Sequence, residues 1–259
     1  MNVRRMWLWG MCVAVGGAAS AATIQDDDFN DNAIGSRWSL IQDSGNLTLA
    51  EQNQRLEASY TAGGSVNDDA IYLSNGVDGF RLATDQDFTI RLDYSFSPGS
   101  AVDAGVGEGV AVVFGVGRDV DGTDAAAIGR GVTNAGFNPA LETGVLAVRE
   151  GDVQSTTLAA VPAAGTFEIS YDSAGDVLTL GTVGGAGYAE AGLVRGVWNA
   201  DSLLVSMGVR GKGFSLAGTT LDDFRIVEGR VVPEPALAGL LPAAALLGWR
   251  GRGARRGCV

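Results

Sequence analysis

The chain has 259 residues, of which 46% are hydrophobic and 39 are glycine, and its formal net charge is −12. This acidity argues against a nucleic acid as a partner, because the phosphate backbone would be repelled. The chain contains no histidine, and its two cysteines lie near its two ends, which excludes histidine base chemistry and histidine metal ligation and predicts a central domain without disulfides.

Residues 1–22 have the layout of a signal peptide. Two arginines precede an apolar run, residues 6–15, and small residues follow that run. Ala19 and Ala21 have the small side chains that a signal peptidase accepts, so we expect this enzyme as a processing partner. The segment predicts a signal helix, export through the inner membrane and cleavage near residue 21 or 22.

Residues 23–230 are expected to form one β-rich domain. Apolar and polar residues alternate over residues 87–96, which is typical of a half-buried antiparallel strand. The continuous apolar run of residues 109–116 predicts a central strand covered on both faces. A turn-rich spacer joins two strand patterns between residues 167 and 180, which predicts a hairpin. The pattern as a whole indicates an all-β, antiparallel two-sheet sandwich.

Both ends of this domain carry motifs that resemble one known fold. Asp27-Asp28-Phe29-Asn30-Asp31-Asn32 is followed by Trp38, and the domain closes with Leu221-Asp222-Asp223-Phe224-Arg225-Ile226. These motifs resemble the edges of concanavalin A-like (laminin-G-like) jelly rolls. The resemblance implies a jelly-roll sandwich whose first and last strands lie side by side. The acidic residues of both motifs would then need a cation or full solvation.

Three residues are candidates for carbohydrate binding. Glu108 precedes a glycine and an apolar strand, and this arrangement resembles the strand entry of legume-type lectins with Glu in place of Asp. The resemblance implies that its carboxylate bonds sugar hydroxyls; the alternative is an ordinary loop residue. Trp38 and Trp198 are the tryptophans that remain after processing, and exposed indoles stack on sugar rings. Core positions are the alternative for both.

A calcium site is the one cofactor hypothesis. Asp119, Asp121 and Asp124 lie within six residues that also contain a glycine, and Ca²⁺ takes six to eight oxygen ligands from such flexible loops. The segment lacks the remaining positions of an EF-hand loop. A solvated acidic loop is therefore the alternative.

An enzyme of this fold would need two carboxylates at a suitable separation. Glu150 and Asp152 could share one strand face, but the Glu-x-Asp-x-Glu and Glu-x-Asp-x-x-Glu motifs of concanavalin A-like glucanases do not occur in the chain. We therefore expect that the domain is not an enzyme. A carbohydrate-active hydrolase on the same fold remains the alternative.

Residues 231–259 resemble the PEP-CTERM sorting signal of exosortase systems. The motif at residues 232–235 contains Pro233, Glu234 and Pro235, and the apolar segment 236–249 follows it. The basic end, residues 250–256, supplies a cytoplasmic stop under the positive-inside rule through Arg250, Arg252, Arg255 and Arg256. The resemblance implies a hydrophobic helix that anchors the chain transiently in the inner membrane. It also implies exosortase as a partner and release to the outer surface or extracellular matrix of a Gram-negative bacterium.

Together these features predict an exported and processed surface or matrix protein. Its expected role is to bind exopolysaccharide without catalysis or to serve as a structural module. The hydrolase and a calcium-stabilised adhesion module are the alternatives that the sequence leaves open.

Overall fold

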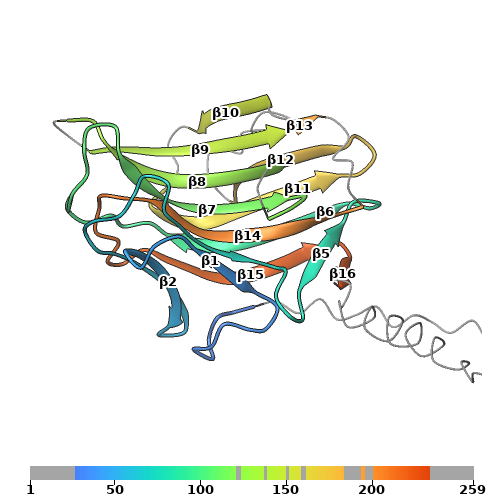
Figure 1. Cartoon of the computed structure of the whole chain (residues 1–259). Helices are drawn as coiled ribbons and strands as arrows, with labels where there is room; N and C mark the ends of the chain where they lie inside the picture. The colour runs from blue at the N-terminus through green and yellow to red at the C-terminus, as the bar shows by residue number, and fades with distance from the viewer. Residues whose placement is uncertain are drawn as a thin grey trace, which may run out of the picture.

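The computed structural model describes residues 27–120, 124–136, 139–149, 152–158, 162–183, 194–195 and 201–233. Their strands form two antiparallel sheets that face each other (Figure 1). The predicted all-β two-sheet sandwich is therefore confirmed. The expected signal helix, residues 1–22, and hydrophobic helix, residues 236–249, lie outside the described residues. Within the described ranges no helix is long and apolar enough to cross a membrane.

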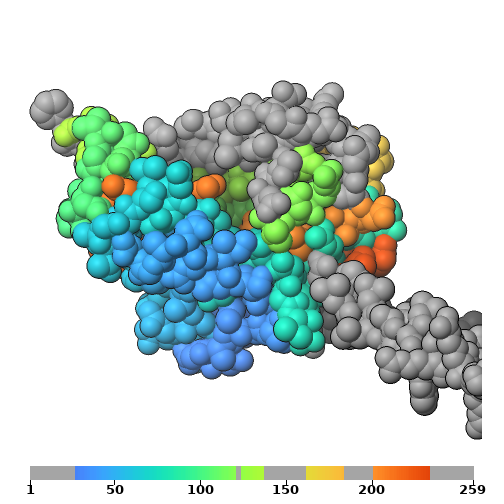
Figure 2. Space-filling view, viewed as in Figure 1, coloured from blue at the N-terminus to red at the C-terminus, as the bar shows by residue number. Residues whose placement is uncertain are grey.

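The larger sheet carries the surface that is analysed below. Its strand order is β1 (Ser39–Gln42), β4 (Asp69–Leu73), β14 (Ser202–Gly211), β7 (Gly109–Gly117), β8 (Ala125–Asn134), β9 (Pro139–Arg149) and β10 (Asp152–Leu158). β5 (Phe80–Ala83) also pairs with β14, and β16 (Val231–Pro233) pairs with β5. The C-terminal strand β16 thus lies beside β5 at one corner of the domain (Figures 1 and 2).

The smaller sheet has the order β13 (Val194–Arg195), β12 (Val177–Thr182), β11 (Ala164–Asp172), β6 (Phe88–Ser95), β15 (Thr220–Glu228), β3 (Arg55–Tyr60) and β2 (Leu47–Gln52). The hairpin predicted between residues 167 and 180 is confirmed, since β11 pairs directly with β12. In β6 every second side chain is buried, as its alternating sequence predicts.

The inward side chains of both sheets form one hydrophobic core. In the larger sheet β14 contributes Val205, Met207 and Val209, all with no exposed surface, and β7 contributes Val112 and Phe114, also fully buried. Because side chains alternate along a strand, the residues between them point away from the core. The outward face of this sheet is therefore set by the same strands that fill the core.

The expectation that residues 109–116 are covered on both faces is wrong for part of the strand. β7 is central, with β14 and β8 as neighbours, but its outward residues Ala111 and Val113 are only half-buried. No second layer packs on this outward face among the described residues. The run is apolar throughout because its outward residues are small and floor a groove.

An aromatic cluster joins the segment that precedes β1 to β15. Asp27 and Phe224 form an antiparallel bridge through two backbone hydrogen bonds of 3.1 and 2.9 Å. The Phe224 ring contacts Trp38, Phe80 and Phe114 at centroid distances of 5.3, 6.1 and 6.3 Å. The two terminal motifs therefore meet through this single bridge. The first strand, β1, pairs with β4, and the last described strand, β16, pairs with β5, so the implied pairing of the first and last strands is not what the structure shows.

Replacing Phe224 with alanine should destabilise the domain by about 3–5 kcal/mol, because the truncation leaves a cavity among three aromatic rings. Chemical denaturation of the full chain, followed by tryptophan fluorescence, measures the change. Val227→Ala is the matched control on the same strand, since Val227 is 51% exposed and its truncation should change the free energy of unfolding by no more than about 0.5 kcal/mol. Equal losses in the two variants would contradict this account of the core.

Candidate functional site

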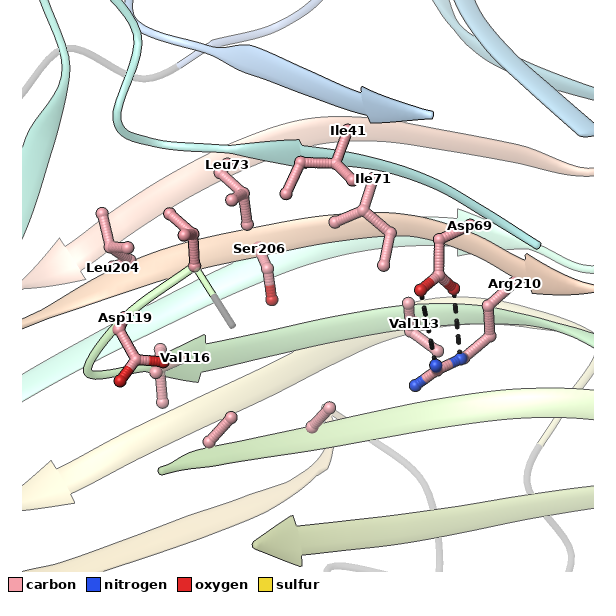
Figure 3. Close-up of a pocket in the computed structure, with 14 residues that line it drawn as sticks. Ile41, Asp69, Ile71, Leu73, Val113, Val116, Asp119, Leu204, Ser206 and Arg210 are labelled. Carbon is pink, nitrogen blue, oxygen red and sulfur yellow. Dashed lines mark hydrogen bonds and ion pairs between the residues drawn. The ribbon is translucent and has the colours of Figure 1, made fainter. Parts of the chain in front are cut away.

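A groove runs over the outward face of the larger sheet (Figure 3). Its volume is about 340 Å³, which lies within the range of small-molecule sites in proteins. It crosses β4, β14, β7 and β8, and most of its lining is apolar, contributed by Ile41, Ile71, Leu73, Val113, Val116, Val120, Ala125, Ala127 and Leu204. The described lining holds no aromatic residue. Its polar side chains are Asp69, Asp119, Ser206 and Arg210.

Glycines on neighbouring strands make the floor of the groove low. Gly208 on β14 pairs with Val113, which in turn pairs with Gly129 on β8. A Cβ atom built on Gly208 would lie 2.3 Å from the carbonyl oxygen of Ala70, so no larger residue fits there. Glycine weakens the interior of a strand and marks places where a ligand or another backbone approaches closely. The alternate glycines in β7 and β8 are a signal in the sequence that could have indicated this surface.

One end of the groove holds an ion pair. Arg210 Nε lies 3.3 Å from Asp69 Oδ1, and Arg210 Nη2 lies 3.4 Å from Asp69 Oδ2. The Asp69 side chain is 22% exposed and that of Arg210 is 50% exposed. Burial is the main cause that raises the pKa of Asp69, and the Arg210 charge opposes this rise. Sequence reasoning missed both residues, because strands 141 positions apart bring them together.

The predicted calcium loop lies at the other end of the groove. Asp119 and Asp124 both pair with Arg118, at 3.8 Å and 3.1 Å. Asp121 lies outside the described residues. In the described part of the chain no group of three or more acidic, cysteine or histidine residues is placed to hold a metal ion. The structure thus brings an arginine between two of the three predicted ligands, and calcium binding stays a prediction.

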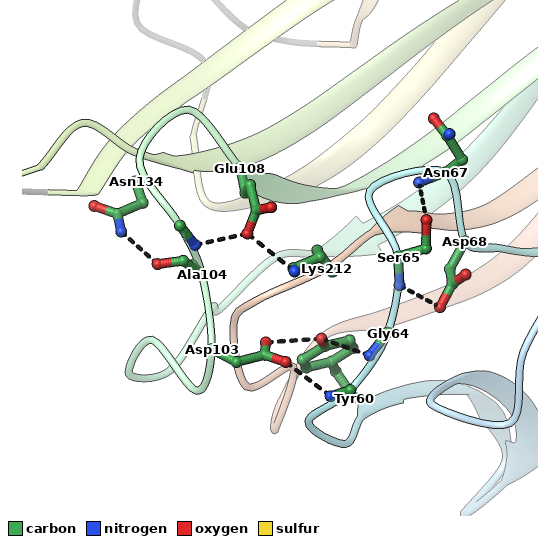
Figure 4. A network of polar contacts seen from close by, with 12 residues as sticks. Tyr60, Gly64, Ser65, Asn67, Asp68, Asp103, Ala104, Glu108, Asn134 and Lys212 are labelled. Carbon is green, nitrogen blue, oxygen red and sulfur yellow. Dashed lines mark hydrogen bonds and ion pairs between the residues drawn. The ribbon is translucent and has the colours of Figure 1, made fainter.

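Glu108 belongs to a polar network at the end of β14 (Figure 4). Its Oε2 atom lies 3.1 Å from Lys212 Nζ and accepts a hydrogen bond of 2.6 Å from the backbone N–H of Gly105. These two contacts, with the Gly105 hydrogen bond as the larger effect, lower the pKa of Glu108. The carboxylate that was predicted to bind sugar is therefore engaged with the protein itself.

The same network ties together loops from distant parts of the chain. Asp103 accepts hydrogen bonds from the Tyr60 hydroxyl, at 2.8 Å, and from the Gly63 backbone, at 2.7 Å. Asp68 accepts one from the Ser65 backbone at 2.9 Å. The Ser44 hydroxyl also donates to Asp68 and, ahead of the Ser65 backbone, lowers the pKa of that carboxyl. The Gly63 backbone and the Tyr60 hydroxyl lower the pKa of Asp103. Because Asp68 adjoins Asp69 in sequence, the network also holds the end of the groove that carries the ion pair.

The other predicted residues fall in three places. Trp38 is 5% exposed and donates from Nε1 to Asp27 Oδ2 at 2.6 Å, so it lies in the core. Pro233 ends β16. The remaining predicted sites lie outside the described residues: Ala19, Ala21, Trp198, Glu234, Pro235, Arg250, Arg252, Arg255 and Arg256. Glu150 is also outside them, and Asp152 begins β10.

Comparisons with known proteins identify the fold. No family model matches the chain, and no curated protein matches it. An endo-1,3-beta-glucanase from Streptomyces sioyaensis has a similar structure, with a TM-score of 0.51 and 12% identity over 78% of this chain and 94% of that one. A glycoside hydrolase family protein from Mycobacterium thermorestibile gives 0.49, with 12% identity over 78% and 99%. A legume lectin-like domain from Entamoeba histolytica gives 0.45, with 12% identity over 74% and 90%.

The expectation that this domain is not an enzyme is contradicted by the comparison with the glucanase. The two proteins share a fold at 12% identity, so the architecture is one that also serves glucan hydrolysis. The missing Glu-x-Asp-x-Glu motif excluded one arrangement of catalytic carboxylates. It did not exclude catalysis by residues that the fold assembles from separate strands.

The polar network should make the domain sensitive to acid. The folded-state pKa values of Asp68, Asp103 and Glu108 are all lowered, so their stabilising contribution is present above about pH 4, the ordinary carboxyl range, and is lost as the pH falls through the lowered values. Glu108→Gln should lower Tm at pH 7 and reduce the loss of Tm between pH 7 and pH 3. Thermal unfolding at several pH values measures both effects.

Glu228→Gln is the control for this comparison, because Glu228 is an exposed carboxylate on β15, outside the network. Its thermal profile should follow that of the original chain. If Glu108→Gln changed neither Tm at pH 7 nor the loss of Tm between pH 7 and pH 3, the stabilising contribution of the Glu108–Lys212 pair would be refuted.

Proposed function

We propose that this chain is a carbohydrate-active domain that holds a polysaccharide in the groove over β14 and β7. The observation that carries the proposal is a groove of about 340 Å³ on a fold shared with an endo-1,3-beta-glucanase. Trp38 and Glu108, which the sequence predicted to bind sugar, are not available to a ligand, since Trp38 is buried and Glu108 is ion-paired. The groove therefore replaces them as the proposed site.

The lining suits a sugar chain in two respects. Aliphatic side chains such as Ile71 and Val113 provide an apolar floor, and a few polar groups lie among them, the usual composition of a ligand site. Ser206 and Asp69 supply a hydroxyl and a carboxylate for hydrogen bonds to sugar hydroxyls. The glycine floor lets a ring approach the sheet closely.

Hydrolysis of the bound glycan is the second candidate function. The shared fold favours it, and burial raises the pKa of Asp69, which is the direction that a proton donor requires. The strand register gives the separation of the two ends of the groove. Arg210, at the Asp69 end, is paired with Ala111 of β7. Gly117, next to the Asp119 loop, lies about 20 Å further along the same strand, at ~3.3 Å per residue. Asp69 and Asp119 are thus too far apart for a catalytic pair, whose carboxyls lie about 5–9.5 Å apart. Among the described residues of the groove, Asp69 therefore suits the proton donor of such a mechanism, and Asp119 does not suit its partner.

Filling the groove should weaken glycan binding. Ala127 is a half-buried residue of the lining, and Ala127→Trp should weaken binding of the β-1,3-glucan laminarin at least about tenfold, or about 1.4 kcal/mol. Affinity electrophoresis of the full chain measures binding, and release of reducing ends from the same glucan measures hydrolysis.

Ser59→Trp is the matched control, because Ser59 is an exposed small residue on the outward face of the smaller sheet. It should bind as the original chain does. If neither binding nor reducing ends are detected with laminarin or with other polysaccharides, the proposed function is wrong. Binding that survives Ala127→Trp would move the site elsewhere.

We further propose that the chain is exported, cut by signal peptidase and exosortase, and released to the outer surface or extracellular matrix, where exopolysaccharide would be the glycan it meets. The motif of residues 232–235 supports this. Pro233 ends β16, which pairs with β5 at the edge of the domain, and it is exposed. The Pro-Glu-Pro motif therefore begins where the last described strand ends.

Intact mass and cell fractionation test this processing. In a host with exosortase the chain should lose both ends and appear outside the inner membrane, whereas in the same host without exosortase the tail should remain. Glu234→Ala should retain the tail in both hosts. A tail that stays attached in both hosts with the original chain would refute exosortase processing.

A further inference from the structure

We propose that the Asp69–Arg210 pair makes the groove selective for neutral polysaccharides and excludes acidic ones. This inference rests on the proposed function and names the class of glycan for the same groove. Its basis is the charge of the groove, which is set by three ionised residues of the lining, Asp69, Asp119 and Arg210 (Figure 3).

The one cation of the described lining is already neutralised within the protein. Arg210 meets Asp69 at two points, with N–O distances of 3.3 and 3.4 Å. A guanidinium recognises a carboxylate, sulfate or phosphate through the same paired donors. An acidic glycan that used this edge of the guanidinium would have to displace Asp69, and one that used the other edge would still bring a second negative charge beside Asp69. Two like charges so close together are disfavoured in a partly buried site.

The opposite end of the groove offers no attraction for an anion either. Asp119 lines it, and the neighbouring Arg118 is paired with both Asp119 and Asp124. The whole chain carries a net charge of −12, so its long-range field also repels polyanions, most strongly at low salt. Both local and global charge thus act in the same direction.

A neutral sugar meets none of these penalties. Its hydroxyls hydrogen-bond to charged partners without changing their charge, and the ion pair can stay in place. The apolar floor contributed by Ile71, Val113 and Ala127 contacts the C–H groups of a ring. Asp69 is thereby a specificity-determining residue, because its charge decides what Arg210 is free to bind.

The test is a reversal of selectivity. Asp69→Asn keeps the shape of the side chain and releases the Arg210 charge, so binding to the polyuronate alginate should increase by about tenfold or more. Affinity electrophoresis of the full chain in laminarin and in alginate, at low and at high salt, provides the comparison. The original chain should bind laminarin and should not bind alginate. The increase in alginate binding by Asp69→Asn should disappear at high salt.

The double variant Asp69→Asn with Arg210→Gln is the control, since the released cation is absent from it and the gain on alginate should be lost. Thermal unfolding confirms that each variant is folded. Equal binding of laminarin and alginate by the original chain, or no gain in Asp69→Asn, would overturn the selectivity. If the original chain binds neither glycan while Asp69→Asn still gains alginate, the proposed function fails and the inference about Arg210 stands.

Discussion

The pairing of β14 with strands from three other parts of the chain is the constraint on which the rest of the structure depends. β14 hydrogen-bonds to β4, β5 and β7, so residues near positions 70, 82 and 113 meet along one strand. Its inward valines and Met207 fill the core, and its outward Ser206 and Arg210 line the groove. Core and candidate site are thus two faces of one strand and cannot vary independently.

The floor of the groove is low because neighbouring strands approach too closely for side chains at three glycine positions. Gly208, Gly115 and Gly129 lie on three adjacent strands, and each weakens its strand relative to a β-branched residue. A Cβ atom on Gly208, Gly115 or Gly129 would lie 2.3, 2.9 or 3.0 Å from a carbonyl oxygen of an adjacent strand. A low floor lets another molecule approach the sheet closely, as the proposed polysaccharide site requires.

Several cationic side chains of this acidic domain are paired with carboxylates of the protein itself. Arg210 pairs with Asp69, Lys212 with Glu108, and Arg230 with Asp85 at 2.7 Å. Ion pairs at a protein surface contribute little to stability. Their larger effect is on recognition, because a cation that is paired internally is not available to an anionic ligand. The net negative charge of the chain disfavours nucleic acid as a partner. The pairing of Arg210 with Asp69 disfavours anionic ligands at the groove as well.

The sequence by itself determined the fold class, because alternation with a period of two in residues 87–96 and the hairpin at residues 167–180 are local patterns that a strand imposes. The resemblance of the terminal motifs to concanavalin A-like edges also implied that the two ends of the domain lie close together, and Asp27 does form a bridge with Phe224. Only the tertiary structure decided which candidate residues are accessible and which polar groups meet. Trp38 is buried, Glu108 is bound to Lys212, and Asp69 faces Arg210 across 141 positions. Such contacts depend on strand order, which no local pattern encodes.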